Sequence, residues 1–250
     1  MSQPSRLPEP AGLVARVFDL TYRRLYALVR NTWAAVGIEV AILVVLAAAG
    51  LAGFGWLAVE MHAGVLSGSE EQLMLLVGAN RTSGLTSAAR ALSFIGSGAV
   101  AIPFAILVAV LLRALGRGRE ARLYLWVTAS GWAINGLAKA AFRRARPEVI
   151  SHLGSGGWYS FPSGHAMLAP LVFGLGAFLL VRGMKNVALK TGVLLAAAAL
   201  VAGIAVSRVY LGVHYPTDVV GALLAGVGWA ALWLAGTAVT ARDSGAVPTG

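Results

Sequence analysis

Hydrophobic residues dominate six stretches of the sequence, and short polar turns separate them. A helix that crosses a bilayer needs about 20 apolar residues, and each stretch approaches that length. The third, fourth and fifth are the shortest, so they span only if the polar residues at their ends lie at the membrane interface. The predicted spans are residues 40–59, 91–112, 123–142, 166–181, 191–207 and 219–241. The pattern predicts an all-α, polytopic membrane protein with six transmembrane helices in a bundle.

The two ends of the chain flank this six-helix domain, which we place at residues 33–241. Residues 1–32 form a cytoplasmic N-terminal segment in which leucines fall at loosely helical spacing among arginines. Two interpretations stay open for it: an amphipathic helix on the inner membrane surface, or a partly ordered tail. Residues 242–250 are expected to be a disordered C-terminal tail. The apolar segment Leu73–Ala79 is too short to span, so we expect it to rest in the outer interface.

The composition supports a membrane protein and excludes several function classes. Hydrophobic residues make up 58% of the 250 positions and charged residues only 12%. A soluble domain carries about 25% charged residues. The net charge of +10 forms no basic run on a soluble face, so we do not expect nucleic acid as a partner. The absence of cysteine excludes disulfides, thiolate catalysis and cysteine metal sites.

Basic residues are concentrated at one end of the predicted bundle. They crowd the N-terminal segment and the turns after the second and fourth spans, so the positive-inside rule places both termini in the cytoplasm. The protein is then expected in the cell membrane, with Glu60, Glu70 and Glu71 in an outer loop. Some arginines follow the third and fifth spans on the outer side and oppose the rule: Arg143, Arg144, Arg146 and Arg208. They require an explanation other than topology.

Three polar clusters lie at the outer ends of the third to sixth spans. The first contains the cations Lys139 and Arg146, and the third contains Arg208. Snorkelling to the interface explains one such cation, but three on the disfavoured side indicate a shared anionic ligand. Arginine binds phosphate oxygens with two parallel hydrogen bonds, and lysine adds a point charge. For Arg143 and Arg144 two interpretations stay open: contact with a second phosphate or a headgroup, or simple solvation.

The second cluster, Pro162-Ser163-Gly164-His165, directly precedes the fourth span. Proline and glycine favour a turn into a helix N-terminus, whose free N–H groups and dipole attract anions. Glycine lets the backbone approach a ligand closely, and Ser163 adds a hydroxyl donor. A lone histidine at an interface is usually a polar anchor, but at this helix start we interpret His165 as a general acid.

The third cluster places His214 four residues before Asp218, with Pro216 between them. If the sixth helix begins near Pro216, Asp218 can reach one imidazole nitrogen of His214 and make the other more nucleophilic. A simple helix-start carboxylate is the alternative for Asp218, and the two roles are compatible. A zinc site is disfavoured because no third ligand is evident and the arginines would repel a cation.

In this order and spacing, the clusters resemble the motifs of the type 2 phosphatidic acid phosphatase superfamily: KxxxxxxRP, PSGH and SRxxxxxHxxxD. Every fixed motif position is matched, by Lys139, Arg146, Pro147, Pro162, Ser163, Gly164, His165, Ser207, Arg208, His214 and Asp218. The resemblance implies a metal-independent phosphatase without a cofactor. It also implies an active site at the extracytoplasmic ends of the third to sixth helices.

The resemblance further implies a role for each motif residue. His214 is the nucleophile that forms a phosphohistidine, Asp218 orients it, and His165 protonates the leaving group. Ser207 is expected to support the site. The groups expected to bind the substrate phosphate and to stabilise the transition state are Lys139, Arg146, Ser163, Gly164 and Arg208.

The membrane setting indicates a lipid substrate, because a site at this depth meets headgroups while the lipid tail stays in the bilayer. Undecaprenyl diphosphate and phosphatidylglycerophosphate are the expected substrates, and phosphatidic acid and a lipid A phosphate are further candidates. Three alternatives stay open: a lipid phosphotransferase with the same nucleophile, a haloperoxidase, and a transporter or lipid-binding protein without catalysis. The sequence does not predict the oligomeric state.

Overall fold

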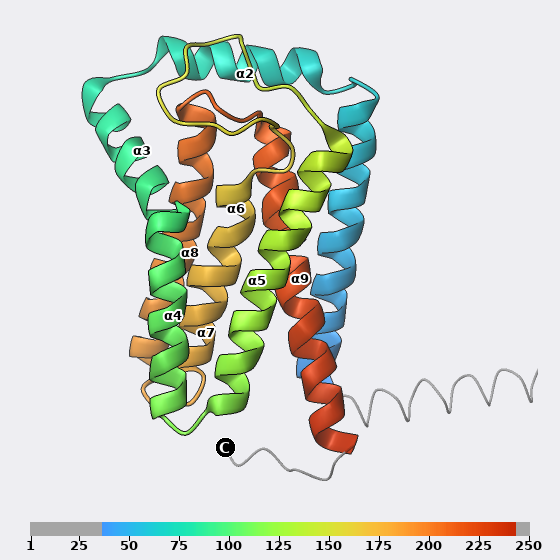
Figure 1. The fold of residues 1–250 in the computed structure, drawn as a ribbon, viewed down its shortest axis with the longest axis vertical. Helices are drawn as coiled ribbons and strands as arrows, with labels where there is room; N and C mark the ends of the chain where they lie inside the picture. Colours follow the sequence, from blue (N-terminus) through green and yellow to red (C-terminus); the bar gives the residue numbers. More distant parts are fainter. Residues whose placement is uncertain (1–36, 244–250) are drawn as a thin grey trace, which may run out of the picture. The chain divides into compact units, whose positions relative to one another are not determined.

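The computed structural model describes residues 37–243, and within this range every regular element is a helix, as predicted. In chain order the elements are the helix Gly37–His62, α2 (Ser67–Ala79), α3 (Ser83–Ile95), α4 (Gly98–Ala114), α5 (Gly118–Phe142), α6 (Gly164–Ala169), the π-helical turn η1 (Pro170–Gly174), α7 (Leu175–Val181), α8 (Val187–Tyr210) and α9 (Pro216–Asp243). Contacts divide the chain into residues 1–42 and residues 43–250, and the second unit holds α2 to α9 (Figure 1).

The predictions for the chain ends fall largely outside the described residues. Those for residues 1–32 and 244–250 lie wholly outside them. Helix α9 continues to Asp243, so the predicted tail begins as helix.

Several helices are long and apolar enough to cross a bilayer, as expected for a multi-pass membrane protein. Among the described residues these are Gly37–His62, Gly164–Val181, Val187–Tyr210 and Pro216–Val239. The pair α3 and α4 counts as a fifth span if it is taken together, although the two helices meet at a bend of 49°. Helix α5 occupies the place of the third predicted span, but Asn135 and Lys139 lower its hydropathy. The total of six spans therefore stays a prediction.

The helix that carries the PSGH cluster is the most buried of the candidate spans. Of the residues in Gly164–Val181, 67% are buried. Glycines on neighbouring helices permit this packing. A Cβ at Gly131 of α5 would lie 2.2 Å from Leu171 Cδ1, and one at Gly226 of α9 would lie 2.6 Å from Met167 O. Small residues let helices approach closely in a membrane, so the start of this helix is held firmly by its neighbours.

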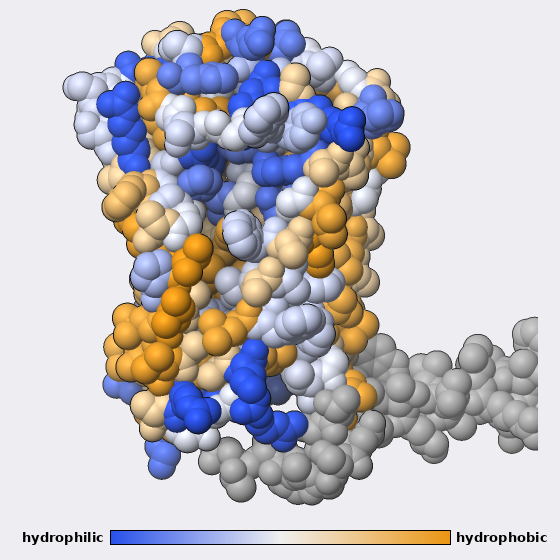
Figure 2. Space-filling model, viewed as in Figure 1, coloured by the Kyte–Doolittle hydropathy of each residue, from blue (hydrophilic) through white to orange (hydrophobic). Residues whose placement is uncertain are grey.

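Helix α2 lies across the end of the bundle where α5 ends and α6 begins (Figure 1). It contains the segment Leu73–Ala79, which was predicted not to span, and it begins earlier, at Ser67. The irregular segment 143–163 runs over the same end. Figure 2 shows one face of the molecule, in the same view as Figure 1. Hydrophobic side chains lie along its flanks, and hydrophilic side chains gather towards its two ends. This distribution is the one expected of a bundle with an apolar middle and wet ends.

Candidate active site

A cavity of about 370 Å³ lies where α5 ends and α6 begins. The loop between these helices, the end of α8 and the turn before α9 complete its walls. The lining residues are Lys139, Arg146, Ser155, Gly156, Gly157, Trp158, Tyr159, Gly164, His165, Arg208 and His214. The lining thus brings together the three predicted phosphate-binding cations and both predicted catalytic histidines, and it contains no carboxylate.

Backbone carbonyls of the loop between α5 and α6 hold two of the cations. Lys139, in the last turn of α5, donates a hydrogen bond of 2.9 Å from Nζ to Tyr159 O. Arg146 donates from Nη2 to the same carbonyl at 3.0 Å and from Nε to Gly157 O at 2.6 Å. A Cβ at Gly156 would lie 2.7 Å from Arg146 Cζ, so glycine leaves room for the guanidinium there. The loop therefore fixes both cations at the cavity wall.

Arg208, near the end of α8, is the third cation and is only 2% exposed. Its Nη2 donates a hydrogen bond of 2.7 Å to Ser155 O, and its Nη1 donates to Ser93 Oγ of α3. Among the described residues its Nε has no hydrogen-bond partner. A buried charged donor without an acceptor is costly. An anion bound in the cavity would supply that acceptor.

The start of α6 brings Gly164 and His165 to the cavity. Free N–H groups at a helix start attract anions, and here they belong to the buried span Gly164–Val181. Ser163 precedes the helix and is fully buried, and its Oγ has no hydrogen-bond partner among the described residues. The hydroxyl is thus free to donate, although Ser163 is not among the residues that line the cavity.

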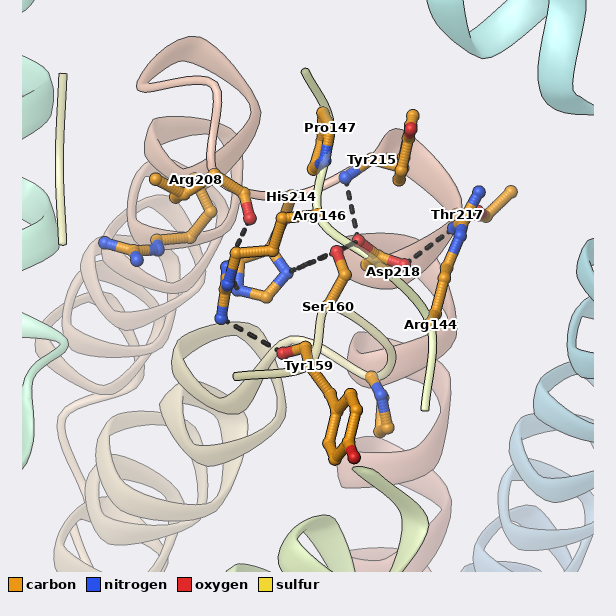
Figure 3. A network of polar contacts seen from close by, with 12 residues as sticks. Arg144, Arg146, Pro147, Tyr159, Ser160, Arg208, His214, Tyr215, Thr217 and Asp218 are labelled. Atoms are coloured by element: carbon orange, nitrogen blue, oxygen red, sulfur yellow. Dashed lines mark hydrogen bonds and ion pairs between the residues drawn. The ribbon is translucent and has the colours of Figure 1, made fainter. Parts of the chain in front are cut away.

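His214 lies in the turn between α8 and α9 and is 2% exposed. Its Nδ1 is 3.3 Å from Asp218 Oδ2, and its Nε2 is 3.4 Å from Arg146 Nη1 (Figure 3). One nitrogen therefore faces a carboxylate and the other faces a cation of the cavity. Burial lowers the pKa of His214 to about 4, an effect that Asp218 partly offsets, so the imidazole is neutral at pH 7. With Nδ1–H donated to Asp218, Nε2 keeps the lone pair that a nucleophile needs.

The Asp218 carboxylate, in the first turn of α9, is fully buried and accepts hydrogen bonds at both oxygens. Its Oδ2 accepts from the backbone N–H of Tyr215 at 2.8 Å and from Ser160 Oγ, and its Oδ1 accepts from Arg144 Nη1 at 2.7 Å. Burial alone would lower the pKa of Arg144, but the carboxylates of Asp218 and Glu70 raise it above its usual value. These donors are the partners that a charged carboxylate requires, and they fix its direction.

Three residues considered for the site do not line the cavity: Ser207, which was expected to support it, and Arg143 and Arg144, for which contact with a second phosphate or a headgroup was one interpretation. Arg144 contacts buried carboxylates instead. Arg143 ends α5 with a left-handed backbone (φ 47°), its side chain is exposed, and its Nε donates to Ala140 O at 3.0 Å. Ser207 donates from Oγ to Ile204 O at 2.6 Å. The structure does not bring Arg143 or Ser207 to the cavity, and each donates a hydrogen bond to a carbonyl of its own helix instead.

Sequence reasoning missed several residues that position the site. Ser160 contacts the Asp218 carboxylate, and its place two residues before the PSGH cluster was an available signal. Ser93 accepts from Arg208 across 115 positions of the chain, and Glu70 reaches the first turn of α9 across 147 positions. No local pattern indicates such distant contacts.

The fold and the cavity together define a class of protein. A multi-pass helical bundle carries three cations and two histidines in one cavity, with a buried carboxylate behind one histidine. Cations that converge in this way suit an oxyanion such as phosphate, and a neutral imidazole beside them can accept a phosphoryl group. These are the features of a membrane phosphatase.

Comparison with known proteins supports the family resemblance. Residues 120–240 match the model of the PAP2 superfamily. Over 174 residues the chain is 26% identical to phosphatidylglycerophosphatase B of Bacillus subtilis (strain 168), which covers 68% of this chain and 84% of that relative. Residues 120–240, just under half of the chain, thus resemble the PAP2 superfamily, and the comparisons support a phosphatase. The resemblance predicted from the three motifs is thereby confirmed.

Two solved structures share the fold. A transmembrane PAP2-type phosphatidylglycerolphosphate phosphatase from Bacillus subtilis superposes with a TM-score of 0.72 at 24% identity, covering 82% of this chain and 98% of that one. LpxE of Aquifex aeolicus superposes with a TM-score of 0.53 at 24% identity, covering 65% of this chain and 93% of that one. The first likeness extends the shared fold beyond the residues that match the family model.

Proposed function

We propose that this protein is a metal-independent lipid phosphate phosphatase that acts through a phosphohistidine intermediate. The observation that carries the proposal is the position of the His214 imidazole (Figure 3). Its Nε2 lies 3.4 Å from Arg146 Nη1, and its Nδ1 lies 3.3 Å from Asp218 Oδ2. The proposed attacking nitrogen is therefore next to a phosphate-binding cation, and a carboxylate supports the opposite nitrogen.

In the first half of the proposed reaction, the three cations and the start of α6 bind the non-bridging phosphate oxygens. The lone pair of His214 Nε2 attacks phosphorus, and the bond from phosphorus to the leaving oxygen breaks. His165 gives its proton to that oxygen, while Asp218 stabilises the positive charge on the phosphorylated imidazole. The cations stabilise the charge of the transition state, which is usually the largest contribution in such sites.

In the second half, His165 is neutral and accepts a proton from a water molecule, whose oxygen attacks the phosphorus of the phosphohistidine. The phosphorus–nitrogen bond breaks, its electron pair returns to His214 Nε2, and inorganic phosphate leaves. The guanidinium and ammonium groups supply the positive charge that a metal ion supplies in other phosphatases.

The membrane bundle and the relative's name support a phospholipid substrate. Phosphatidylglycerophosphate is favoured because it is the substrate in the name of the relative at 26% identity. Undecaprenyl diphosphate, phosphatidic acid and a lipid A phosphate are the next substrates to compare. The distribution of basic residues supports an extracytoplasmic cavity with both termini in the cytoplasm. A lipid in the outer leaflet could then present its phosphate while its tail stays in the bilayer.

The test is phosphate release by purified protein in detergent from these lipid phosphates, with a chelator present. We expect release from at least one of them. We expect His214→Ala to lower turnover by at least about a thousandfold, the loss typical of a covalent nucleophile. His62→Ala is the matched control, because His62 is an exposed histidine outside the cavity lining. Its turnover should equal that of the wild type.

Near-normal turnover of His214→Ala would refute the assignment of the nucleophile. A second arm adds a lipid alcohol to the assay. Transfer of the phosphoryl group to that alcohol in preference to water would indicate a phosphotransferase instead of a phosphatase.

A further inference from the structure

Glu70, which lies outside the segment that matches the family model, contacts two residues next to Asp218: Arg144 and Thr217. Glu70 belongs to α2, which crosses the end of the bundle (Figure 1), and it is only 4% exposed. Its Oε1 accepts hydrogen bonds from the backbone N–H of Thr217 at 3.0 Å and from Thr217 Oγ1 at 2.5 Å. Its Oε2 accepts a bond of 2.6 Å from Arg144 Nη2. Both carboxylate oxygens are thus fixed, one at the start of α9 and one at Arg144.

Arg144 connects Glu70 to the carboxylate behind the histidine. Its Nη1 donates to Asp218 Oδ1 at 2.7 Å and to Thr217 Oγ1 at 2.8 Å, while its Nη2 donates to Glu70. The ring of Tyr215 lies against the guanidinium, with Cζ 4.0 Å from the ring centroid. One positive charge is therefore shared between two buried carboxylates, and the guanidinium has little freedom to turn.

This sharing affects the charge that Asp218 presents to His214. If Arg144 paired with Asp218 alone, it would offset most of that carboxylate's charge in a site of low dielectric. The pull of Asp218 on the imidazole, which becomes positive when it is phosphorylated, would then be weaker. Because Arg144 also pairs with Glu70, its positive charge offsets less of the Asp218 charge. More of the negative potential of Asp218 therefore remains on the side that faces His214.

We propose that Glu70 is a positioning residue for phosphoryl transfer: through Arg144 it sets the charge and direction of Asp218, and thereby the reactivity of His214. The inference rests on the proposed function, in which His214 is the nucleophile. Glu70 does not line the cavity. Its removal should therefore slow the chemical step and leave substrate binding nearly unchanged.

The test compares Glu70→Gln with Glu71→Gln, a change of the same charge at the next residue of α2, where the side chain is exposed. Phosphoenzyme formation from radiolabelled phosphatidylglycerophosphate is followed by rapid quench, together with steady-state kcat and KM. We expect Glu70→Gln to slow both phosphoenzyme formation and kcat about tenfold, the factor for one charge-assisted hydrogen bond. KM should stay within about twofold of the wild type. Glu71→Gln should behave as the wild type.

Several outcomes would overturn the inference. Unchanged kcat with a lower unfolding temperature in Glu70→Gln would show an ion pair that only joins α2 to α9. Equal slowing in Glu71→Gln would show a general charge effect of the helix. A raised KM with kcat kept would show a contact with substrate.

A second variant covers the case in which Glu70→Gln does not fold in detergent. Glu70→Asp keeps the charge on a shorter side chain, so slowing with KM kept supports the inference and a wild-type kcat overturns it. If the wild type itself turns over substrate without a phosphoenzyme, the proposed function fails, and this inference fails with it. The two failures are therefore distinguishable.

Discussion

Replacement of Asp218 by asparagine keeps the shape of the side chain but turns one carboxylate oxygen into an NH2 group. Asp218 is fully buried, and its oxygens accept hydrogen bonds from Arg144 Nη1 at Oδ1 and from Tyr215 N at Oδ2. Whichever way the amide is turned, its NH2 group faces one of these donors. If it also faces His214 Nδ1, that nitrogen must accept, and the proton moves to Nε2, the proposed attacking atom.

The magnitude follows from the wrong tautomer and the lost charge. In Ser-His-Asp triads the same exchange lowers kcat by about ten-thousandfold. Here Nδ1 and Oδ2 are 3.3 Å apart, which is longer than a typical N–H···O hydrogen bond of about 2.9 Å. The starting interaction is therefore weaker than in a tight triad. We expect Asp218→Asn to slow phosphoenzyme formation by about a thousandfold to ten-thousandfold, which corresponds to about 4 to 5 kcal/mol.

The assay is single-turnover formation of the phosphoenzyme, with thermal unfolding in the same detergent as the control for folding. Ser160→Ala gives a graded comparison, because it removes one donor to the same carboxylate without introducing an NH2 group. Its expected loss is about tenfold. A rate for Asp218→Asn within about tenfold of the wild type would refute the view that Asp218 sets the tautomer of His214.

Two further predictions concern stability and sidedness. Burial lowers the pKa of His214 to about 4 from its usual 6.5. Between pH 6.5 and 4 the folded protein therefore binds fewer protons than the unfolded chain. Its free energy of unfolding falls as the pH drops through this range, by about 3 kcal/mol in total. The unfolding temperature of the wild type should therefore fall more steeply from pH 6.5 to 4.5 than that of His214→Asn, and parallel curves would contradict this. Because the chain has no native cysteine, an impermeant thiol reagent added outside cells should label Ser155→Cys, whereas Leu115→Cys, an exposed position at the α4–α5 turn, should react only after permeabilisation. The opposite pattern would reverse the proposed topology.

Much of the fold was predictable because apolar runs are a local property of the sequence. The spans predicted at residues 166–181 and 191–207 lie inside the helical spans Gly164–Val181 and Val187–Tyr210. The bend of 49° between α3 and α4 was not predictable from hydropathy. A hydropathy average over the length of a span does not detect a break of two residues. At the break the chain passes close to α8, because a Cβ at Gly96 would lie 2.5 Å from Ile204 Cγ2, and such a tertiary contact is not visible in a local pattern.

Contacts within the cavity were predictable where the residues of a motif are close together in the sequence. His214 and Asp218 are four residues apart, so the start of one helix determines their contact. The groups that hold the cations were not predictable. Tyr159 O accepts from both Lys139 and Arg146, and a backbone carbonyl leaves no mark in the residue type that carries it. Motif spacing therefore identified which side chains converge, whereas only the folded loop shows what fixes them.

Glu70 and Arg144 show what a count of charges along the sequence does not reveal. Positive-inside reasoning treats each charge as a solvated signal, so Glu70 was an outer-loop acid and Arg144 a cation that needed another cause. In the structure their side chains are 4% and 14% exposed and lie 2.6 Å apart. Buried charges require partners, and Arg144 finds two carboxylates without any phosphate. The cations left for a ligand are Lys139, Arg146 and Arg208, all on the cavity side of the imidazole. Asp218 lies on the other side of the ring, where it partly offsets the effect of burial on the His214 pKa and, in the proposed reaction, would stabilise the positive charge of the phosphorylated imidazole.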